Sequence, residues 1–519
     1  MIPETLSLRA TSLNAERRTV ELDALASGEV VDVLVVGGGV TGAGVALDAA
    51  SRGLSVALLE AHDLAFGTSR WSSKLVHGGL RYLAKGDVGL AHESAVERGI
   101  LMTRTAPHLT RPLPQLIPLH ATVSRRDAAI TFAGLAAGDG LRRAARTPSS
   151  LLPRPRRVSA QEATALAPGL RRDDLRGALL SFDGQLTDDA RLVVALARTA
   201  AGLGARIITR ARVTRLDQSG AEVHCGQTGR TFEVRARSVV NAAGVWAGQL
   251  VDAARLRPSR GSHLVLDGAR TGLTGTALTV PIPGEFGRFA LLLPQDDGRV
   301  YLGLTDEPVD GEIPDVPTVP ESDVDFLLDI ASSALATTLT RDDVLGAFAG
   351  LRPLVEGTNA RSADLSRHHA VLTSGRTVTV VGGKLTTYRK MAADAVDAAV
   401  TAAGLHAGPS RTRRLPLVGA TSRAELSTMD IPERLKARYG TESGRVAALG
   451  ELDPELAEPV SPTGVTAAEV VWAVRHEGAL DAKDVLHRRT RIGLVDSDAA
   501  VAVGPVTRLV DRALAGLLV

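Results

Sequence analysis

The sequence has a single cysteine, Cys225, among its 519 residues. One thiol excludes an intrachain disulfide and a zinc site built from several thiolates, and it favours a reducing compartment. No apolar run approaches the roughly 18 residues of a transmembrane helix, and residues 1–29 lack the apolar core of a signal peptide. Lysine and arginine total 60 against 58 aspartates and glutamates, so no basic excess indicates a nucleic-acid ligand. We therefore expect a cytoplasmic protein.

What is present begins with a strand, a helix and a second strand near the N-terminus. Residues 30–36 (VVDVLVV) form a short β-branched run that is typical of a buried parallel strand. Residues 45–51 have helical character and are followed by Gly53, a residue that commonly ends helices. Residues 54–59 form a second apolar strand. The pattern predicts a complete βαβ unit.

The turn between the first strand and the helix carries the pattern G-x-G-x-x-G at Gly37, Gly39 and Gly42. In such turns the first glycine permits a tight bend, the second allows a pyrophosphate to approach, and the third lets helix and strand pack closely. The helix N-terminus supplies free N–H groups for the phosphates. Glu60 ends the second strand, where an acid accepts hydrogen bonds from ribose hydroxyls. Together these features predict a bound dinucleotide.

The rest of the sheet favours FAD over NAD. Strands are expected at 206–213, 238–243 and 377–381, with a helix at 387–403 after Gly382-Gly383. An NAD domain is usually contiguous, whereas this sheet is assembled from three separated pieces. A polar run at 68–74 is placed to approach the cofactor. The residues expected to contact FAD are Gly37, Gly39, Gly42, Glu60, Thr68, Ser69, Ser73, Lys74, Leu75, Val213, Gly244, Gly382, Gly383 and Leu385.

These patterns predict an α/β fold with a Rossmann-like FAD-binding domain, an α+β substrate cap and a helical C-terminal domain. The expected divisions are an extension at 1–29, a discontinuous FAD domain at 30–403, a linker at 404–420 and the helical domain at 421–519. Cap inserts are expected at about 110–185, which is rich in Arg, Ala and Pro and predicted to be helical, and at about 259–345, which alternates like strands.

Several longer motifs carry a family resemblance. They are SSKLVHGGLRYL at 72–83, GLRPL at 350–354, GGKLTTYR at 382–389 and DVLHRRTR at 484–491, in addition to residues 37–60. In this order they resemble the FAD-dependent respiratory glycerol-3-phosphate dehydrogenases over about residues 30–500. The resemblance implies oxidation of sn-glycerol 3-phosphate to dihydroxyacetone phosphate, with electrons passing from FAD to a membrane quinone. It also implies the glycine-oxidase/D-amino-acid-oxidase type of FAD domain.

The resemblance assigns substrate binding to Arg81, Tyr82, Arg352, Arg367 and Lys384. Guanidinium forks suit a phosphate, and Lys384 would stabilise a developing alkoxide. At Arg367 the sequence departs from the family, because the usual continuation is Asp-Tyr or similar and this chain has a pair of histidines. Adjacent residues of an extended segment point in opposite directions, so we do not expect the pair to bind a metal.

The proton acceptor for the substrate alcohol is open at this point. His77, Arg352 and Lys384 are the candidate catalytic residues; an imidazole accepts protons near neutral pH, whereas arginine is a poor base. His263 is expected to be a structural residue of the cap.

Alternative functions remain on sequence alone. An oxidase that passes electrons to dioxygen and releases hydrogen peroxide would share almost every motif. An amine or amino-acid oxidase would need a carboxylate-binding cap, and a non-catalytic scaffold would lack the site residues. Because a quinone is lipid-soluble, we expect peripheral contact with the inner face of the cell membrane, with Arg411, Arg413 and Arg414 as candidates. Related enzymes suggest a homodimer.

Overall fold

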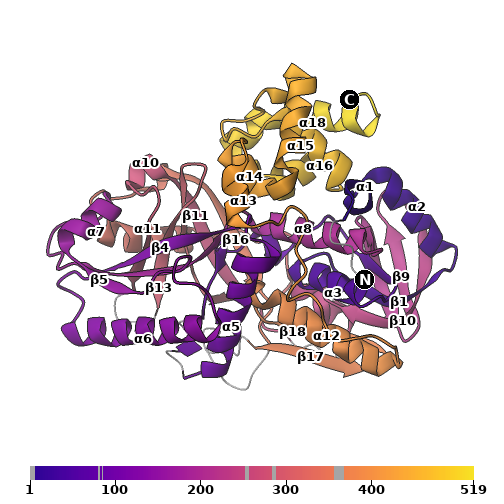
Figure 1. Cartoon of the computed structure of the whole chain (residues 1–519), viewed down its shortest axis with the longest axis horizontal. Helices are drawn as coiled ribbons and strands as arrows, with labels where there is room; N and C mark the ends of the chain where they lie inside the picture. The colour runs from indigo at the N-terminus through magenta and orange to yellow at the C-terminus, as the bar shows by residue number, and fades with distance from the viewer. Residues whose placement is uncertain are drawn as a thin grey trace.

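Two β-sheets lie side by side, and a helical C-terminal region sits across them (Figure 1). The computed structural model describes residues 6–79, 82–83, 86–251, 256–282, 288–355 and 368–518. In Figure 1 the first sheet is on the right, the second is on the left, and the C-terminal helices are drawn in orange and yellow at the top. Among the described residues, no helix is both long and apolar enough to cross a bilayer.

The first sheet has eight strands, with a main path in the order β17-β18-β10-β1-β2-β7. Its strands are β1 (Val30–Val36), β2 (Val56–Leu59), β7 (Arg206–Ile208), β8 (Ala211–Asp217), β9 (Gly220–Cys225), β10 (Thr231–Asn241), β17 (His369–Ser374) and β18 (Thr377–Gly382). The strands β1, β2, β7, β10 and β18 are parallel. The prediction of a sheet assembled from three separated pieces is confirmed. The prediction of one strand over 206–213 is wrong, because the chain turns at Arg210, whose φ is 55°, and begins β8.

Small side chains allow three helices to cover one face of this sheet. They are α3 (Val40–Ser51), α8 (Asp189–Gly202) and α12 (Tyr388–Ala403). A Cβ atom at Gly44 would lie only 3.2 Å from the Cβ of Ala392, so the glycine lets α3 and α12 pack closely. The opposite face is covered by α2 (Ala15–Ala26) and the β8–β9 hairpin, with Leu25 and Val223 in the core between them.

The second sheet forms the cap and has ten strands. They are β3 (Leu75–Val76), β4 (Thr110–Pro118), β5 (Arg156–Val158), β6 (Ala178–Leu186), β11 (Ser259–Asp267), β12 (Ala277–Pro281), β13 (Phe289–Pro294), β14 (Arg299–Gly303), β15 (Glu307–Pro308) and β16 (Val344–Arg352). Helices α7 (Ala160–Leu166), α10 (Gly268–Thr271) and α11 (Glu321–Ala334) border it, and α6 (Arg125–Ala144) runs below it in Figure 1.

The prediction that the insert at 110–185 is helical is wrong at both ends. Strand β4 pairs along its whole length with β6, from Thr110 opposite Leu186 to Pro118 opposite Ala178. The prolines of β4 argue locally against a central strand, but this long-range pairing outweighs them. The alternating strands predicted for 259–345 are confirmed as β11, β13 and β14.

The C-terminal region is helical, as predicted. Its helices are α13 (Arg423–Thr428), α14 (Glu433–Tyr439), α15 (Ser443–Leu452), α16 (Ala467–His476), α17 (Ala482–Asp484) and α18 (Asp496–Leu514), packed around the buried Trp472. The segment that joins it to α12, predicted as a linker at 404–420, packs against the first domain. Its Leu405, Leu415 and Leu417 are buried in the core of the first domain. The residues before β1 likewise form α1 (Leu8–Thr11) and α2 rather than a loose extension.

Candidate active site

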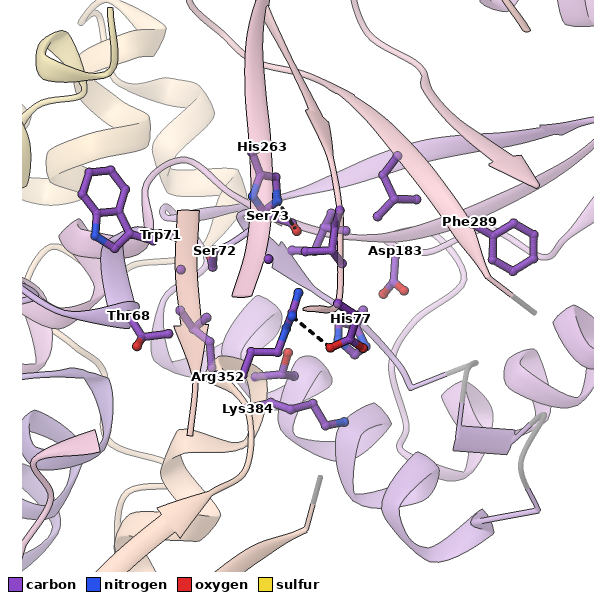
Figure 2. Close-up of a pocket in the computed structure, with 18 of the residues that line it drawn as sticks. Thr68, Trp71, Ser72, Ser73, His77, Asp183, His263, Phe289, Arg352 and Lys384 are labelled. Carbon is purple, nitrogen blue, oxygen red and sulfur yellow. Dashed lines mark hydrogen bonds and ion pairs between the residues drawn. The ribbon is translucent and has the colours of Figure 1, made fainter. Parts of the chain in front are cut away.

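One cavity of about 1790 Å³ lies between the first sheet and the cap. Pockets for small ligands usually measure about 300–1,000 Å³, so this space can hold more than one molecule. The residues predicted to bind cofactor or substrate that line it are Gly37, Gly39, Glu60, Thr68, Ser69, Ser73, Leu75, His77, Tyr82, Val213, Gly244, Arg352, Gly382, Gly383, Lys384 and Leu385. Residues from both domains therefore face a common space, part of which Figure 2 shows.

The glycine turn is built so that only glycines fit. Gly37 follows β1 with a φ of 106°, and a Cβ there would lie 2.7 Å from the carbonyl oxygen of Ala242. A Cβ on Gly42 would lie 1.9 Å from the oxygen of Gly37. Gly42 does not line the cavity, so the structure places it where it allows α3 to approach the turn.

Glu60 closes the turn from the end of β2. Its carboxylate accepts hydrogen bonds from the backbone N–H of Gly38 at 2.6 Å and of His62 at 2.8 Å. Burial raises the pKa of Glu60, and the two backbone hydrogen bonds oppose that rise. The carboxylate is thus held at the cavity wall with oxygens placed to accept further donors.

The polar run after Glu60 forms a loop with a short 3₁₀ turn, Thr68–Arg70. Ser69 Oγ accepts from the backbone N–H of Val40 at 2.9 Å. Thr68 Oγ1 donates at 2.6 Å to the carbonyl oxygen of Leu351, the penultimate residue of strand β16. The loop therefore joins the glycine turn to the cap. Lys74 departs from the expectation of a cofactor contact: its ammonium is buried behind the cavity, bonded to Asp189 at 2.9 Å.

Arg352 ends the cap strand β16 and points into the cavity (Figure 2). Its guanidinium lies 3.2 Å from a carboxylate oxygen of Asp306 and donates to the carbonyl of Thr305 at 3.0 Å. A Cβ at Gly261 would lie 2.2 Å from Nη2 of Arg352, so the glycine makes room for the guanidinium. These contacts hold the guanidinium of Arg352 at the cavity wall.

Lys384 reaches the same space from the first domain, directly after Gly382 and Gly383 with φ values of 75° and 73°. Its ammonium donates to Ser94 Oγ at 2.5 Å and lies 3.8 Å from the ring centroid of Tyr82. The aromatic face attracts the cation. Tyr82 therefore helps to hold Lys384 in place.

His77 lies on the loop that directly follows β3, ahead of helix α5 (Val88–Ile100), and lines the cavity near Lys384 (Figure 2). Its Nδ1 accepts from the backbone N–H of Gly79 at 3.3 Å. The loop is anchored by Asp183, which accepts from the N–H of Gly78 at 3.1 Å and pairs with Arg98 at 2.7 Å. The sequence analysis missed Asp183 and Arg98, because neither lies in a recognisable motif.

His263, predicted to be structural, is buried in the cap and also lines the cavity. Its Nε2 lies 2.8 Å from Ser73 Oγ, and its ring stacks on Phe348 at 4.7 Å between centroids. Burial, with the charges of Lys74 and Arg352, lowers the pKa of His263 to about 3. The ring is therefore neutral at physiological pH.

This lowered pKa predicts a pH dependence of folding. The unfolded chain binds a proton at this histidine below about pH 6.5 and the folded chain does not, so His263 contributes a loss of stability as pH falls from about 6.5 towards 3. We expect His263→Gln, which cannot titrate, to lose less stability than the wild type between pH 7 and pH 5. Urea unfolding at the two pH values measures the difference, and equal losses would contradict the assignment.

Two predicted substrate residues, Arg81 and Arg367, lie outside the described residues. The histidines that follow Arg367 have separate partners. His368 Nε2 lies 2.7 Å from Asp87, and His369 Nε2 lies 2.9 Å from Asp394. The two histidines thus contact carboxylates in different parts of the chain.

Comparisons with known proteins agree with this geometry. Residues 32–389 match the family model described as FAD dependent oxidoreductase, and residues 410–514 match that of the C-terminal domain of alpha-glycerophosphate oxidase. The chain is 52% identical to glycerol-3-phosphate dehydrogenase 1 of Mycobacterium tuberculosis, over 97% of this chain and 99% of the relative. It is 36% identical to a mitochondrial glycerol-3-phosphate dehydrogenase of Arabidopsis thaliana, over 92% and 82%. The structure of glycerol-3-phosphate dehydrogenase from Bacillus halodurans complexed with FAD superposes with a TM-score of 0.73 at 27% identity, covering 97% of each chain.

Proposed function

Because this chain belongs to the FAD-dependent glycerol-3-phosphate dehydrogenase family and its cofactor is FAD, we propose that it oxidises sn-glycerol 3-phosphate to dihydroxyacetone phosphate. One observation carries the proposal: Arg352 from the cap and Lys384 from the FAD domain line the same cavity as the glycine turn. A small dianionic alcohol between them would meet two cations beside the cofactor.

The cavity fits the cofactor at several points. The bend at Gly37 leaves space beside the start of α3, whose N–H groups suit a pyrophosphate. Glu60 offers oxygens to ribose hydroxyls, and Gly382 and Gly383 bring backbone close to the cavity without side chains. When bound, FAD supplies the hydride acceptor, and the protein provides binding, orientation and electrostatics.

The substrate residues divide into two roles. Arg352, with Arg81 and Arg367, is proposed to hold the phosphate, since a guanidinium fork can donate two parallel hydrogen bonds to it. Lys384 is proposed to stabilise negative charge on the alcohol oxygen, and Tyr82 to keep the ammonium in position. His77, Arg352 and Lys384 remain the candidates for accepting the alcohol proton, and an imidazole is a better general base than a guanidinium, which is a poor proton acceptor.

We propose a membrane quinone as the electron acceptor. The cavity extends to residues of the cap and of α6, where its lining includes the apolar side chains of Leu119, Leu135, Leu179, Ile282 and Phe289. A three-carbon phosphate gains nothing from apolar walls, whereas a lipid-soluble ring does. These apolar side chains of the lining therefore support the quinone.

Peripheral contact with the inner face of the cell membrane from the cytoplasm follows as a proposal. Helix α6 exposes Ile130 (45%) and Phe132 (38%) together with Arg125, Arg126 and Arg143, whereas its Arg142 is buried. Such a helix suits an anionic lipid surface. Arg411, Arg413 and Arg414 are exposed as well and remain a second candidate contact. The homodimer also remains a prediction.

The acceptor is tested by following the electrons. With sn-glycerol 3-phosphate and a water-soluble quinone under argon, we expect sustained turnover. In air without quinone, we expect little hydrogen peroxide, because the proposed acceptor is absent. Peroxide formed in step with substrate consumption, and unaffected by quinone, would favour the oxidase instead.

A further inference from the structure

The motif at Asp484–Arg491, here called the coupling segment, belongs to the C-terminal helices, yet its charged side chains contact the other two domains. It spans the end of α17, a π-helical turn over Val485–Arg489 and the two residues that follow. We propose that this segment sets the position of the FAD-contacting loop and of the cap relative to each other, so that Asp63, Arg489 and Arg491 are positioning residues for the active site. The part concerning substrate rests on the proposed function.

On the FAD side, the segment grips one buried carboxylate. Asp63 is 0% exposed, and its two oxygens accept from Arg489 at 2.8 Å each; Oδ2 also accepts from Nε of Arg488 at 2.6 Å. Arg489 is itself 1% exposed, so the pair is fully desolvated. A buried guanidinium that donates two parallel hydrogen bonds to one carboxylate fixes the relative orientation of the two groups more narrowly than apolar packing does.

Asp63 sits at the start of the loop that touches the cofactor site. It lies three residues after Glu60, its carbonyl accepts from the N–H of Phe66 at 3.1 Å, and Ala65 donates to the carbonyl of Gly38 in the glycine turn at 2.9 Å. The chain then runs to Thr68 and Ser69, which line the cavity. The hydrogen bonds that fix Asp63 therefore also restrict, through the backbone, the position of the FAD-contacting loop.

On the cap side, Arg491 donates from Nη1 to Oε1 of Gln295 at 2.8 Å. Gln295 directly follows β13, a strand whose Phe289 and Leu291 line the cavity. Just beyond the segment, the backbone meets β16: a Cβ at Gly346 would lie 2.0 Å from the oxygen of Leu494. The same strand ends at Arg352. The segment thus contacts the end of β13 through Arg491, and the residues just after the segment contact β16; each of these two cap strands carries cavity residues.

The coupling segment matters because the two cations of the site, Arg352 and Lys384, come from different sheets. Arg352 is the last residue of cap strand β16, and Lys384 comes two residues after strand β18 of the FAD sheet, so the distance between the two cations depends on how the sheets are placed. At the cavity itself, the described structure joins the FAD loop to β16 through the hydrogen bond from Thr68 to Leu351. The coupling segment adds contacts on both sheets from outside, and a shift of about 1 Å in a reacting group can cost about 100-fold in rate.

In the full-length holoenzyme, the contact of the coupling segment with the cap and its contact with the FAD domain can be tested by separate variants. For Arg491→Met we expect kcat/KM for sn-glycerol 3-phosphate, measured with a dye acceptor, to fall at least about tenfold while FAD affinity stays unchanged. Arg491→Lys, which keeps the charge, should recover part of the loss. For Asp63→Asn we expect weaker FAD binding by flavin fluorescence. The control is Arg512→Met, whose partner Glu455 lies 3.9 Å away within the same C-terminal region; both quantities should stay unchanged.

Two results would overturn the inference: Arg491→Met with unaltered kcat/KM, or Asp63→Asn with unaltered FAD affinity, even if the melting temperature falls. If Asp63→Asn does not fold, Arg488→Lys gives the same FAD measurement, because it keeps the charge but loses the Nε hydrogen bond. Failure of the proposed function looks different. In that case the wild type would not turn over sn-glycerol 3-phosphate, whereas the FAD measurements on Asp63 would remain informative.

Discussion

Arg352→Met is expected to lower kcat/KM for sn-glycerol 3-phosphate by about 100- to 1,000-fold, the scale of losing one charged donor from a preorganised site. The guanidinium is held at the cavity wall by Asp306 and Thr305, so it needs no reorganisation to meet an anion. Arg352→Lys should restore only part of the activity, because an ammonium lacks the planar fork. Steady-state kinetics with a dye acceptor measure both variants.

A control is needed because methionine also removes the guanidinium from beside the carboxylate of Asp306, which is largely buried. Arg352→Met combined with Asp306→Asn also removes the negative charge at position 306 and should recover stability without recovering activity. If the double variant regained wild-type kcat/KM, Arg352 would serve only to neutralise Asp306, and its assignment to the substrate would be wrong.

Gly37→Ala is expected to yield protein without the yellow colour of bound FAD. An alanine at position 37 would have to adopt a φ of 106°, and its Cβ would lie 2.7 Å from the oxygen of Ala242. The turn between β1 and α3 would therefore have to move. Gly53→Ala is the matched control: its φ is 88°, but its Cβ would meet no atom within 4 Å. We expect this control to lose some stability and to keep FAD. The flavin absorbance per chain after purification measures both, and full occupancy in Gly37→Ala would contradict the role given to the turn.

The sequence predicted the FAD domain well because its signals are local. An apolar strand, a glycine turn and an acid occur within residues 30–60, and each has a fixed structural consequence. The insert at 110–185 was misjudged because β4 and β6 are stabilised by each other across more than 50 intervening residues, which no local pattern records.

The partners of the site residues could not be predicted for the same reason. Ser94, which binds Lys384, is 290 residues away in the sequence, and Asp183 holds the His77 loop across 105 residues. Lys74 shows the opposite error. Its position in a polar run suggested a cofactor contact, but a φ of 56° turns the chain there and directs the ammonium to Asp189.

The measurement that tests the central claim most directly is the anaerobic reduction of the bound flavin. When sn-glycerol 3-phosphate is added to the yellow protein in the absence of any acceptor, we expect the visible flavin absorbance to bleach. The enantiomer, sn-glycerol 1-phosphate, serves as the control and should leave the spectrum unchanged. If its phosphate and alcohol were held by the same two cations, its hydrogen on carbon 2 would point away from the bound flavin. A spectrum that stays oxidised with sn-glycerol 3-phosphate, in protein that dithionite reduces normally, would contradict the account.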